Sequence, residues 1–178
     1  MKKLLIITFA IIGIISVNAQ EEGKFRVGLD LGYIFANDGG ALFSIEPKYN
    51  ITDNSNIGLR LGTAASIGIS DADSNISILG TYDYYFNSQN SSTSPFLGIG
   101  LGYFALGDIG GGGPGGVAIN LGEQFGALVR GGVELGKFRI ALEYNILPKS
   151  DLEFGESIKN SYLGASVGFY LGGGKWKN

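Results

Sequence analysis

Residues 125–146 read FGALVRGGVELGKFRIALEYNI, and this stretch decides the fold. In both halves every second residue is apolar or glycine, while the residues between them include two arginines and two glutamates. A period of two is typical of β-strands. Gly136 and Lys137 separate the halves, with glycine at the first turn position as a type II′ turn requires. The stretch therefore predicts a β-hairpin with one apolar and one charged face.

The same alternation extends in both directions along the chain and defines eight segments. They are residues 25–35, 41–51, 57–67, 76–86, 95–105, 125–135, 138–146 and 162–171. Each has about ten residues, the length that a tilted strand needs to cross the apolar core of a bilayer. No helical period competes with this pattern. We therefore expect an all-β protein, built as an antiparallel up-and-down β-barrel of eight strands.

The two faces of these strands differ in charge. One face has 46 positions and no charged residue, whereas the other has 39 positions, of which ten are charged and eleven are glycine. The ten charged residues are Arg26, Asp30, Glu46, Lys48, Arg60, Asp83, Arg130, Glu134, Arg139 and Glu143. Five of them are basic and five are acidic, so together they form a neutral set.

These faces can be arranged in two ways. A water-soluble barrel such as a lipocalin would turn its apolar face inward, and a narrow barrel would then have to pack many large side chains while glycines covered its outside. If the apolar face points outward, lipid solvates it, and the glycines inside leave room for long arginine and glutamate side chains. The second arrangement is sterically easier, so the sequence predicts a transmembrane barrel with a charged lumen.

The aromatic residues of the apolar face support the same choice, because they fall near the strand ends. Those near one set of ends are Tyr33, Phe35, Phe43, Tyr103, Phe125 and Tyr144. Those near the other set are Phe25, Tyr49, Tyr82, Tyr84, Phe86, Phe138 and Phe169. Aliphatic residues such as Leu61 and Val129 occupy the strand middles. Two aromatic girdles around an aliphatic waist are typical of transmembrane β-barrels.

The segment from Tyr82 to Phe104 contains Tyr-Asp-Tyr-Tyr-Phe, a polar turn, and then Pro-Phe-Leu-Gly-Ile-Gly-Leu-Gly-Tyr-Phe. It resembles the repeating hairpin of the small outer-membrane β-barrel family that groups outer membrane proteins A, X and W. This resemblance extends over the mature chain as a pattern of strands and implies an eight-stranded barrel in a bacterial outer membrane. Barrels of that family often end in an aromatic residue that the insertion machinery reads. Phe169 and Tyr170 are the candidates for that residue in this chain.

The N-terminus has the features of a secretory signal peptide. Two lysines precede an apolar run at residues 4–15, which is short for a transmembrane helix, and small residues up to Ala19 supply a cleavage site. We expect a cleaved signal peptide at residues 1–19 and one outer-membrane barrel domain at residues 20–178. An uncleaved N-terminal anchor is the alternative.

The chain of 178 residues contains no cysteine and no histidine. Disulfides, thiolate and histidine metal sites, and Ser-His or Cys-His catalysis are therefore excluded. The formal net charge of −3 argues against nucleic acid as a partner. Carboxylates such as Glu134 and Glu143 remain for acid–base chemistry, but the equal number of basic residues favours a structural network. We therefore expect neither an enzyme nor a bound cofactor or metal.

The links between the segments predict the orientation of the barrel. With the N-terminus in the periplasm, the long links at residues 106–124 and 147–161 lie outside the cell, and the turn at residues 136–137 lies on the periplasmic side. Pro47 falls inside the second segment, where it removes a hydrogen bond from a closed sheet. We therefore expect a local β-bulge at Pro47.

The turn at Gly136 and Lys137 also predicts which charges meet. It places Glu134 opposite Arg139 and Arg130 opposite Glu143, and directly opposed residues are close enough to interact. Several aromatic residues also point inward, namely Phe96, Phe104, Tyr162 and Tyr170. Because an eight-stranded barrel is narrow enough for side chains to fill, we expect a plugged lumen.

These features favour a structural or surface-interaction protein of the outer membrane. A small pore or a conduit for hydrophobic solutes is the alternative, and an outer-membrane enzyme is a third possibility. The expected partners are outer-membrane lipid, the outer-membrane assembly machinery, and an extracellular or envelope partner of unknown identity. We expect a monomer that binds no nucleic acid.

Overall fold

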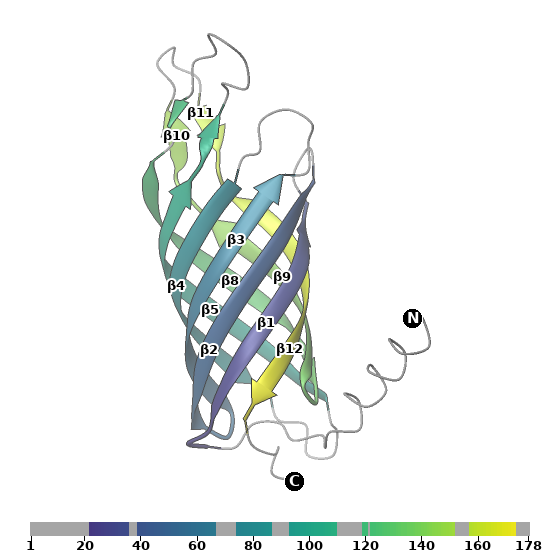
Figure 1. The fold of residues 1–178 in the computed structure, drawn as a ribbon. Helices are drawn as coiled ribbons and strands as arrows, with labels where there is room; N and C mark the ends of the chain where they lie inside the picture. Colours follow the sequence, from purple (N-terminus) through teal and green to yellow (C-terminus); the bar gives the residue numbers. More distant parts are fainter. Residues whose placement is uncertain are drawn as a thin grey trace, which may run out of the picture.

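A computed structural model of the protein describes residues 22–35, 39–66, 74–86, 93–109, 119–120, 122–151 and 157–173. Eight antiparallel strands form a closed barrel (Figure 1). They are β1 (Phe25–Ile34), β2 (Gly40–Thr52), β3 (Ser55–Ser66), β4 (Ser74–Tyr85), β5 (Thr93–Leu106), β8 (Glu123–Leu135), β9 (Phe138–Ile146) and β12 (Tyr162–Gly172). The predicted all-β, eight-stranded up-and-down barrel is thus confirmed, and each predicted segment matches an observed strand to within two residues at either end.

The barrel closes because its first strand pairs with its last. β1 and β12 are joined in one antiparallel register from the pair Arg26 and Gly172 to the pair Ile34 and Gly164. Every other barrel strand pairs with the barrel strands before and after it in the chain. In lipid all backbone groups must find partners within the protein, and a closed sheet provides them. No helix among the described residues is long and apolar enough to cross a membrane.

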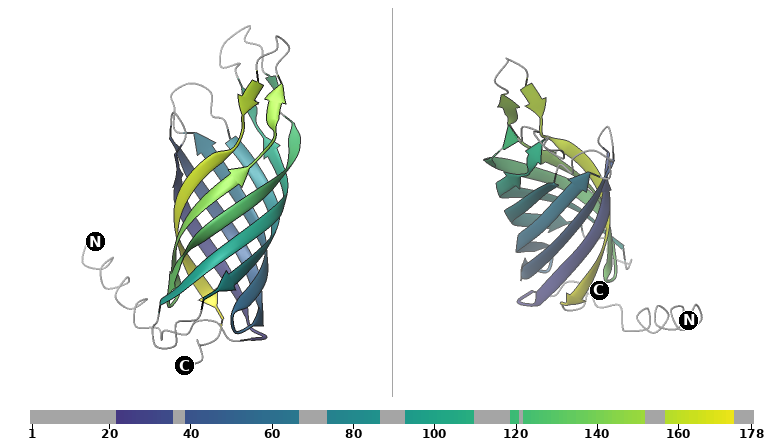
Figure 2. Two further views of the ribbon diagram at one scale, coloured as in Figure 1. Left: turned by 180° about the vertical axis from the view of Figure 1, so that it is seen from behind. Right: turned by 45° about the horizontal axis from the view of Figure 1, so that its top comes forward.

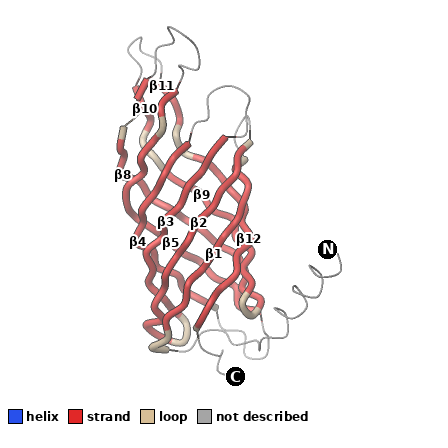
Figure 3. The backbone as a smooth tube through the Cα atoms, viewed as in Figure 1, coloured by secondary structure: helices blue, strands red, loops and turns tan. Residues whose placement is uncertain are grey.

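The two ends of the barrel differ in their links. At the end that we call the turn end, Gly136 and Lys137 join β8 to β9 as predicted, and Gly136 has the positive φ of 63° that favours glycine. At the opposite, loop end, two short ribbons rise beyond the rim (Figures 1 and 2). They pair β6 (Asp108–Ile109) with β7 (Ile119–Asn120), and β10 (Lys149–Asp151) with β11 (Ser157–Lys159). The ribbons lie within the two links that were expected to form long loops, so part of each link is regular (Figure 3).

The ladder between β2 and β3 shows that the expected bulge at Pro47 is wrong. The pairs on either side of the proline keep one register, Ile45 with Leu61 and Lys48 with Gly58. The register shift lies instead beside the turn between these two strands. Proline lacks one backbone donor, and the loss of one hydrogen bond leaves the neighbouring pairs in place. No extra residue is needed to accommodate it.

The apolar face of the strands points outward, as predicted. Large aliphatic side chains such as Leu31, Ile76 and Val167 are more than 60% exposed. Exterior aromatic rings pack edge to face in pairs, namely Tyr33 with Phe35, Tyr84 with Phe86, Tyr103 with Phe125, and Phe138 with Phe169. A continuous apolar surface of this kind suits lipid and would aggregate in water.

An arginine on the exterior should therefore lower the stability of the barrel strongly only where it lies near the middle of the bilayer. Val129 lies at the middle of β8 and is exposed, whereas Leu135 is exposed at the turn end of the same strand. We expect Val129→Arg to lower the free energy of unfolding by about 2–4 kcal/mol, and the matched control Leu135→Arg by about 0–1 kcal/mol. Denaturant titration of the protein folded into lipid vesicles measures both changes. Equal losses at the two positions would contradict the outward orientation.

Candidate functional site: the charged lumen

The ten charged residues predicted for the lumen all lie on the inner face of the barrel. Each is at most 3% exposed. They come from β1, β2, β3, β4, β8 and β9, while the buried inner faces of β5 and β12 carry glycines, aromatic residues and two serines, Ser94 and Ser166. Six strands therefore contribute the charged side chains of the lumen, and the glycines of the other two strands leave room for them.

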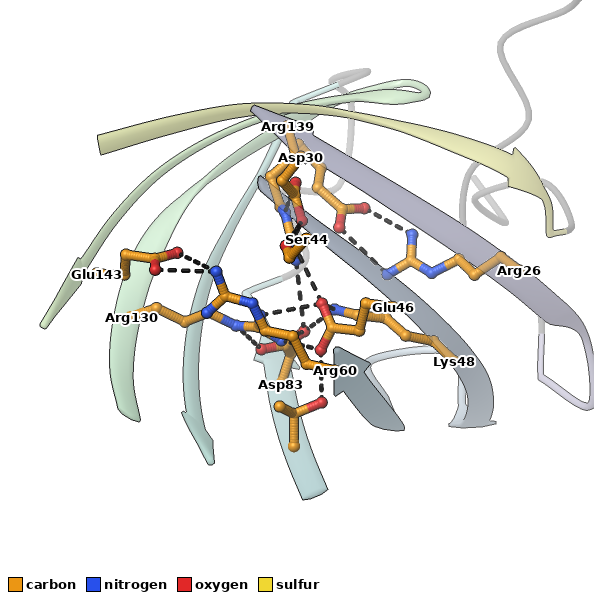
Figure 4. A network of polar contacts seen from close by, with 12 residues as sticks. Arg26, Asp30, Ser44, Glu46, Lys48, Arg60, Asp83, Arg130, Arg139 and Glu143 are labelled. Carbon is orange, nitrogen blue, oxygen red and sulfur yellow. Dashed lines mark hydrogen bonds and ion pairs between the residues drawn. The ribbon is translucent and has the colours of Figure 1, made fainter. Parts of the chain in front are cut away.

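Arg130 lies at the centre of the charged residues (Figure 4). Its guanidinium donates two hydrogen bonds to the Glu46 carboxylate, at 3.0 and 2.7 Å. It donates two more to the Asp83 carboxylate, at 2.9 and 3.0 Å. Bidentate pairs of this kind combine charge with fixed geometry, so Arg130 holds β2, on the opposite wall, and β4 in a defined relation to β8.

Two further cations and one further carboxylate complete the group. Arg139 donates to the Asp30 carboxylate at 2.5 and 3.2 Å and to Glu46 at 3.3 Å. Lys48 forms ion pairs with Asp83 and, at 3.4 Å, with Glu46. We call the six residues the central ion cluster: Asp30, Glu46, Lys48, Asp83, Arg130 and Arg139. It contains three cations and three carboxylates, so the cluster is neutral.

Hydroxyl groups satisfy part of the remaining bonding capacity of the carboxylates. Thr81 Oγ1 donates to Glu46 at 2.6 Å, and Ser44 Oγ donates to Asp30 at 3.1 Å. Buried charge is tolerated only when it is both paired and hydrogen-bonded. These contacts meet that requirement for the three carboxylates of the cluster, whereas Nη1 of Arg139 is buried without a hydrogen-bond partner.

Two one-to-one ion pairs flank the central ion cluster. Arg26 donates to both oxygens of Glu134, at 2.9 and 3.1 Å, and the hydroxyl of Tyr85 bridges the two side chains. Arg60 Nη2 lies 2.9 Å from each oxygen of Glu143. All ten predicted residues are therefore accounted for, six in the cluster and four in the flanking pairs.

The predicted partners of the β8 and β9 charges are wrong, although the predicted register is right. Glu134 lies opposite Arg139 and Arg130 opposite Glu143 along the ladder. Their observed partners are Arg26, Asp30, Glu46, Asp83 and Arg60, as described above. Among the described residues, the ion pairs join strands that are not neighbours, apart from Lys48 and Glu46 on β2. Side chains on the inside of a narrow barrel converge on its axis, so long ones reach the far wall more readily than a neighbour beside them.

Glycines make space for this crossing. A Cβ atom on Gly98 of β5 would overlap the Asp83 carboxylate and lie 3.1 Å from the Arg130 side chain. A Cβ atom on Gly168 of β12 would overlap the Asp30 carboxylate. Gly98 and Gly168 are thus explained by the volume of the charged side chains that lie against them, whereas Gly102 lies against the backbone of β4.

Uncharged side chains fill the lumen on both sides of the charged layer. At the turn end, the ring of Tyr170 lies 3.9 Å from Arg26 Cζ, and the ring of Phe96 stacks on Tyr85 at 5.5 Å between centroids. At the loop end, four buried residues form a group that we call the apolar stopper: Leu79, Phe104, Leu128 and Leu147. The inward orientation expected for Phe96, Phe104 and Tyr170 is confirmed.

The apolar stopper was not predicted from the sequence. Its signal was present, because Leu79 and Leu128 occupy the otherwise charged or glycine-rich face of their strands. Leu147 gave no such signal, since it lies after the end of the periodic segment that forms β9.

Within the described ranges, no group of three or more acidic residues is placed to hold a metal ion. The carboxylates of the lumen are occupied by arginine, lysine and hydroxyl groups, and are therefore committed to structural contacts.

Comparison with solved structures finds similar barrels. Neisserial surface protein A gives a TM-score of 0.57 at 18% identity, covering 83% of this chain and 95% of that one. The outer membrane protein OprG of Pseudomonas aeruginosa gives 0.52 at 11% identity, covering 86% and 98%. The N-terminal β-barrel domain of Pseudomonas aeruginosa OprF gives 0.50 at 17% identity, covering 85% and 100%. This chain has the fold of the small outer-membrane β-barrels.

The resemblance lies in the fold and not in the sequence. No family model matches the chain, and no curated protein matches it. A fold shared with outer-membrane barrels and a continuous apolar exterior together indicate a barrel that spans a lipid bilayer.

The ion pair of Arg60 and Glu143 predicts a non-additive pair of substitutions. Arg60→Met leaves Glu143 buried without its cation and should lower the free energy of unfolding by about 3–5 kcal/mol. Adding Glu143→Gln removes the stranded charge, so the double variant should be more stable than Arg60→Met alone. Denaturant titration in lipid vesicles measures the coupling.

The matched control combines Arg130→Met with Glu143→Gln. These two positions lie opposite each other in the ladder but have different ionic partners. We expect no rescue in this control, because Glu143→Gln removes nothing that Arg130 held. If Glu143→Gln stabilised the Arg130→Met variant but not the Arg60→Met variant, the result would favour the pairing of Arg130 with Glu143 that was expected from the register.

Proposed function

We propose that the protein is an integral outer-membrane barrel with a structural or surface-interaction role, whose lumen is filled by the charged network. The observation that carries this proposal is the mutual neutralisation of ten buried charges across the lumen. A channel for polar solutes needs side chains that water or solute can reach. Here the charged groups are bonded to each other.

A pore or a conduit for hydrophobic solutes is less well supported. A polar solute would have to displace the apolar stopper. An apolar solute that passed the stopper would meet the central ion cluster. An enzyme is also less well supported, because the chain has no histidine or cysteine and its inner carboxylates are paired. The proposal therefore assigns no catalytic residue and no cofactor.

A surface role would use the loop end, where the two ribbons extend beyond the barrel rim (Figure 2). The base of the β10–β11 ribbon is tied to the rim: Asn160 Nδ2 donates to Gln124 Oε1 at 3.2 Å and to the carbonyl oxygen of Pro148 at 2.9 Å. A fixed base limits the entropy that a partner would have to remove on binding. We propose that an extracellular or envelope partner binds at this end and that the barrel itself is monomeric in lipid.

Planar-bilayer recording tests the filled lumen. The refolded, unmodified protein should insert without giving stable single-channel steps, because the charged and apolar layers leave no continuous path for ions. A porin of known conductance, refolded in the same way, is the positive control. Reproducible steps of uniform size from this protein would favour the pore.

The assembly machinery of the outer membrane is the second proposed partner, and the structure separates its two candidate signals. Phe169 points outward and its ring packs on Phe138 at 5.2 Å between centroids, whereas Tyr170 is buried in the lumen. An external receptor would contact the outer face of the last strand. We therefore propose Phe169 as the aromatic residue that is read.

Phe169→Ala should reduce the fraction of protein assembled in the outer membrane of cells, measured as the heat-modifiable band on electrophoresis. Phe138→Ala is the matched control, because it removes the same aromatic contact from a strand that is not the last. It should assemble like the unmodified protein. Equal losses in the two variants would show that the ring contact matters and that Phe169 is not a signal.

A further inference from the structure

The apolar stopper joins three barrel strands to one residue outside them. Leu79, Phe104 and Leu128 come from β4, β5 and β8, and each is at most 1% exposed. Leu147 lies in the link between β9 and β10 and packs against these three with 5% exposure. A residue of the link therefore completes the apolar layer at the loop end.

Leu147 is held in this position by a serine on the other side of the link. The hydroxyl of Ser161 accepts a hydrogen bond from the Leu147 amide and donates one to the Leu147 carbonyl oxygen, both at 3.0 Å. Both backbone groups are satisfied, so the link can sit at the rim without exposing unpaired polar groups to the apolar layer. Tyr162, the next residue, packs against the stopper.

The layer extends across the rest of the barrel mouth. Ile34, Leu42 and Ala64 from β1, β2 and β3 form a second buried apolar group, and Tyr162 packs against it as well as against the stopper. Apolar side chains thus reach from β1 to β8 at the loop end.

The central ion cluster lies directly below the stopper. On β4, Leu79 is followed on the lumen face by Thr81, which donates to Glu46. On β8, Leu128 is followed on the same face by Arg130. Two strands therefore show the same order, from the apolar layer to the charged layer.

We propose that the lumen is closed by two separate seals in series, an outer apolar seal completed by Leu147 and an inner ionic seal formed by the central ion cluster. The inference rests on the filled lumen proposed above and divides it into two parts. The outer seal excludes external water by apolar packing, whereas the inner seal blocks the lumen by side chains bonded across it. Opening the outer seal should expose the top of the ion cluster and still leave no path through the barrel.

The absence of cysteine from the chain makes a direct test available. A single cysteine introduced as Thr81→Cys lies between the two seals, at a position that is 5% exposed. Its reaction with methyl methanethiosulfonate forms a mixed disulfide and releases methanesulfinate, and the added mass is followed with time on the folded protein. We expect slow modification in Thr81→Cys alone, and acceleration on the order of tenfold or more when Leu147→Ala is added, because local opening controls access.

Phe96→Ala is the matched control. It truncates a buried apolar side chain at the turn end, on the other side of the ion cluster. In combination with Thr81→Cys it should leave the modification slow, because the inner seal lies between the two positions. Glu123→Cys, on an exposed residue at the start of β8, shows that the reagent is active.

Folding of each variant is checked by heat-modifiable migration. If Leu147→Ala does not fold, Ser161→Ala replaces it, since it removes the two hydrogen bonds that hold Leu147 and should also accelerate the modification of Thr81→Cys. Rapid modification of Thr81→Cys alone would overturn the outer seal, as would unchanged rates with Leu147→Ala or Ser161→Ala. Equal acceleration by Phe96→Ala would overturn the inner seal.

Bilayer recording separates this inference from the proposed function. The Leu147→Ala variant should remain silent, because the ion cluster is intact. Single-channel steps from the Leu147→Ala variant but not from the unmodified protein would contradict the inner ionic seal. They would still agree with a filled lumen in the natural protein. Steps from the unmodified protein would contradict the proposed function itself.

Discussion

Arg130 shows the constraint on which the rest of the structure depends: a charge inside this barrel must find its counter-charge in the protein. The lumen of eight strands is narrow, and a buried charge without a partner costs several kcal/mol. Glu46 and Asp83 supply the partners of Arg130 from β2 and β4. The equal numbers of acidic and basic side chains, and the hydroxyls that complete their bonding, follow from the same requirement.

The same requirement explains how the strands divide their tasks. Six strands contribute charge, and β5 and β12 each contribute a glycine, Gly98 and Gly168, whose missing side chain leaves room for a carboxylate. Outside, no such accommodation is needed, because lipid solvates leucine, isoleucine and the aromatic rings equally around the barrel. Polar inside and apolar outside, the protein inverts the arrangement of a water-soluble barrel while keeping the same closed backbone ladder.

Much of this could be predicted from the sequence, because it depends on local period and local turns. Alternation identified the strands and the face of the ten charged residues within them, and the turn at Gly136 set the register of β8 and β9. The partners of Glu134 and Arg130 could not be predicted, since the alternation gives the face of a residue but not the strand that lies across the lumen from it. Leu147 was missed for a related reason. It packs inside the barrel from a link, where no period applies.

The closing seam between β1 and β12 has a consequence for the order in which the protein folds. Arg26 and Asp30 of β1 find their counter-charges in Glu134 and Arg139, which are 108 and 109 residues away in the chain. Neighbouring hairpins can form early, since their contacts are local, but these two ion pairs require β1 to have come together with β8 and β9. Until then, Arg26 and Asp30 have not met the ionic partners that neutralise them in the closed barrel. The ionic contacts of β1 thus belong to the last stage of folding, when the ends of the sheet join.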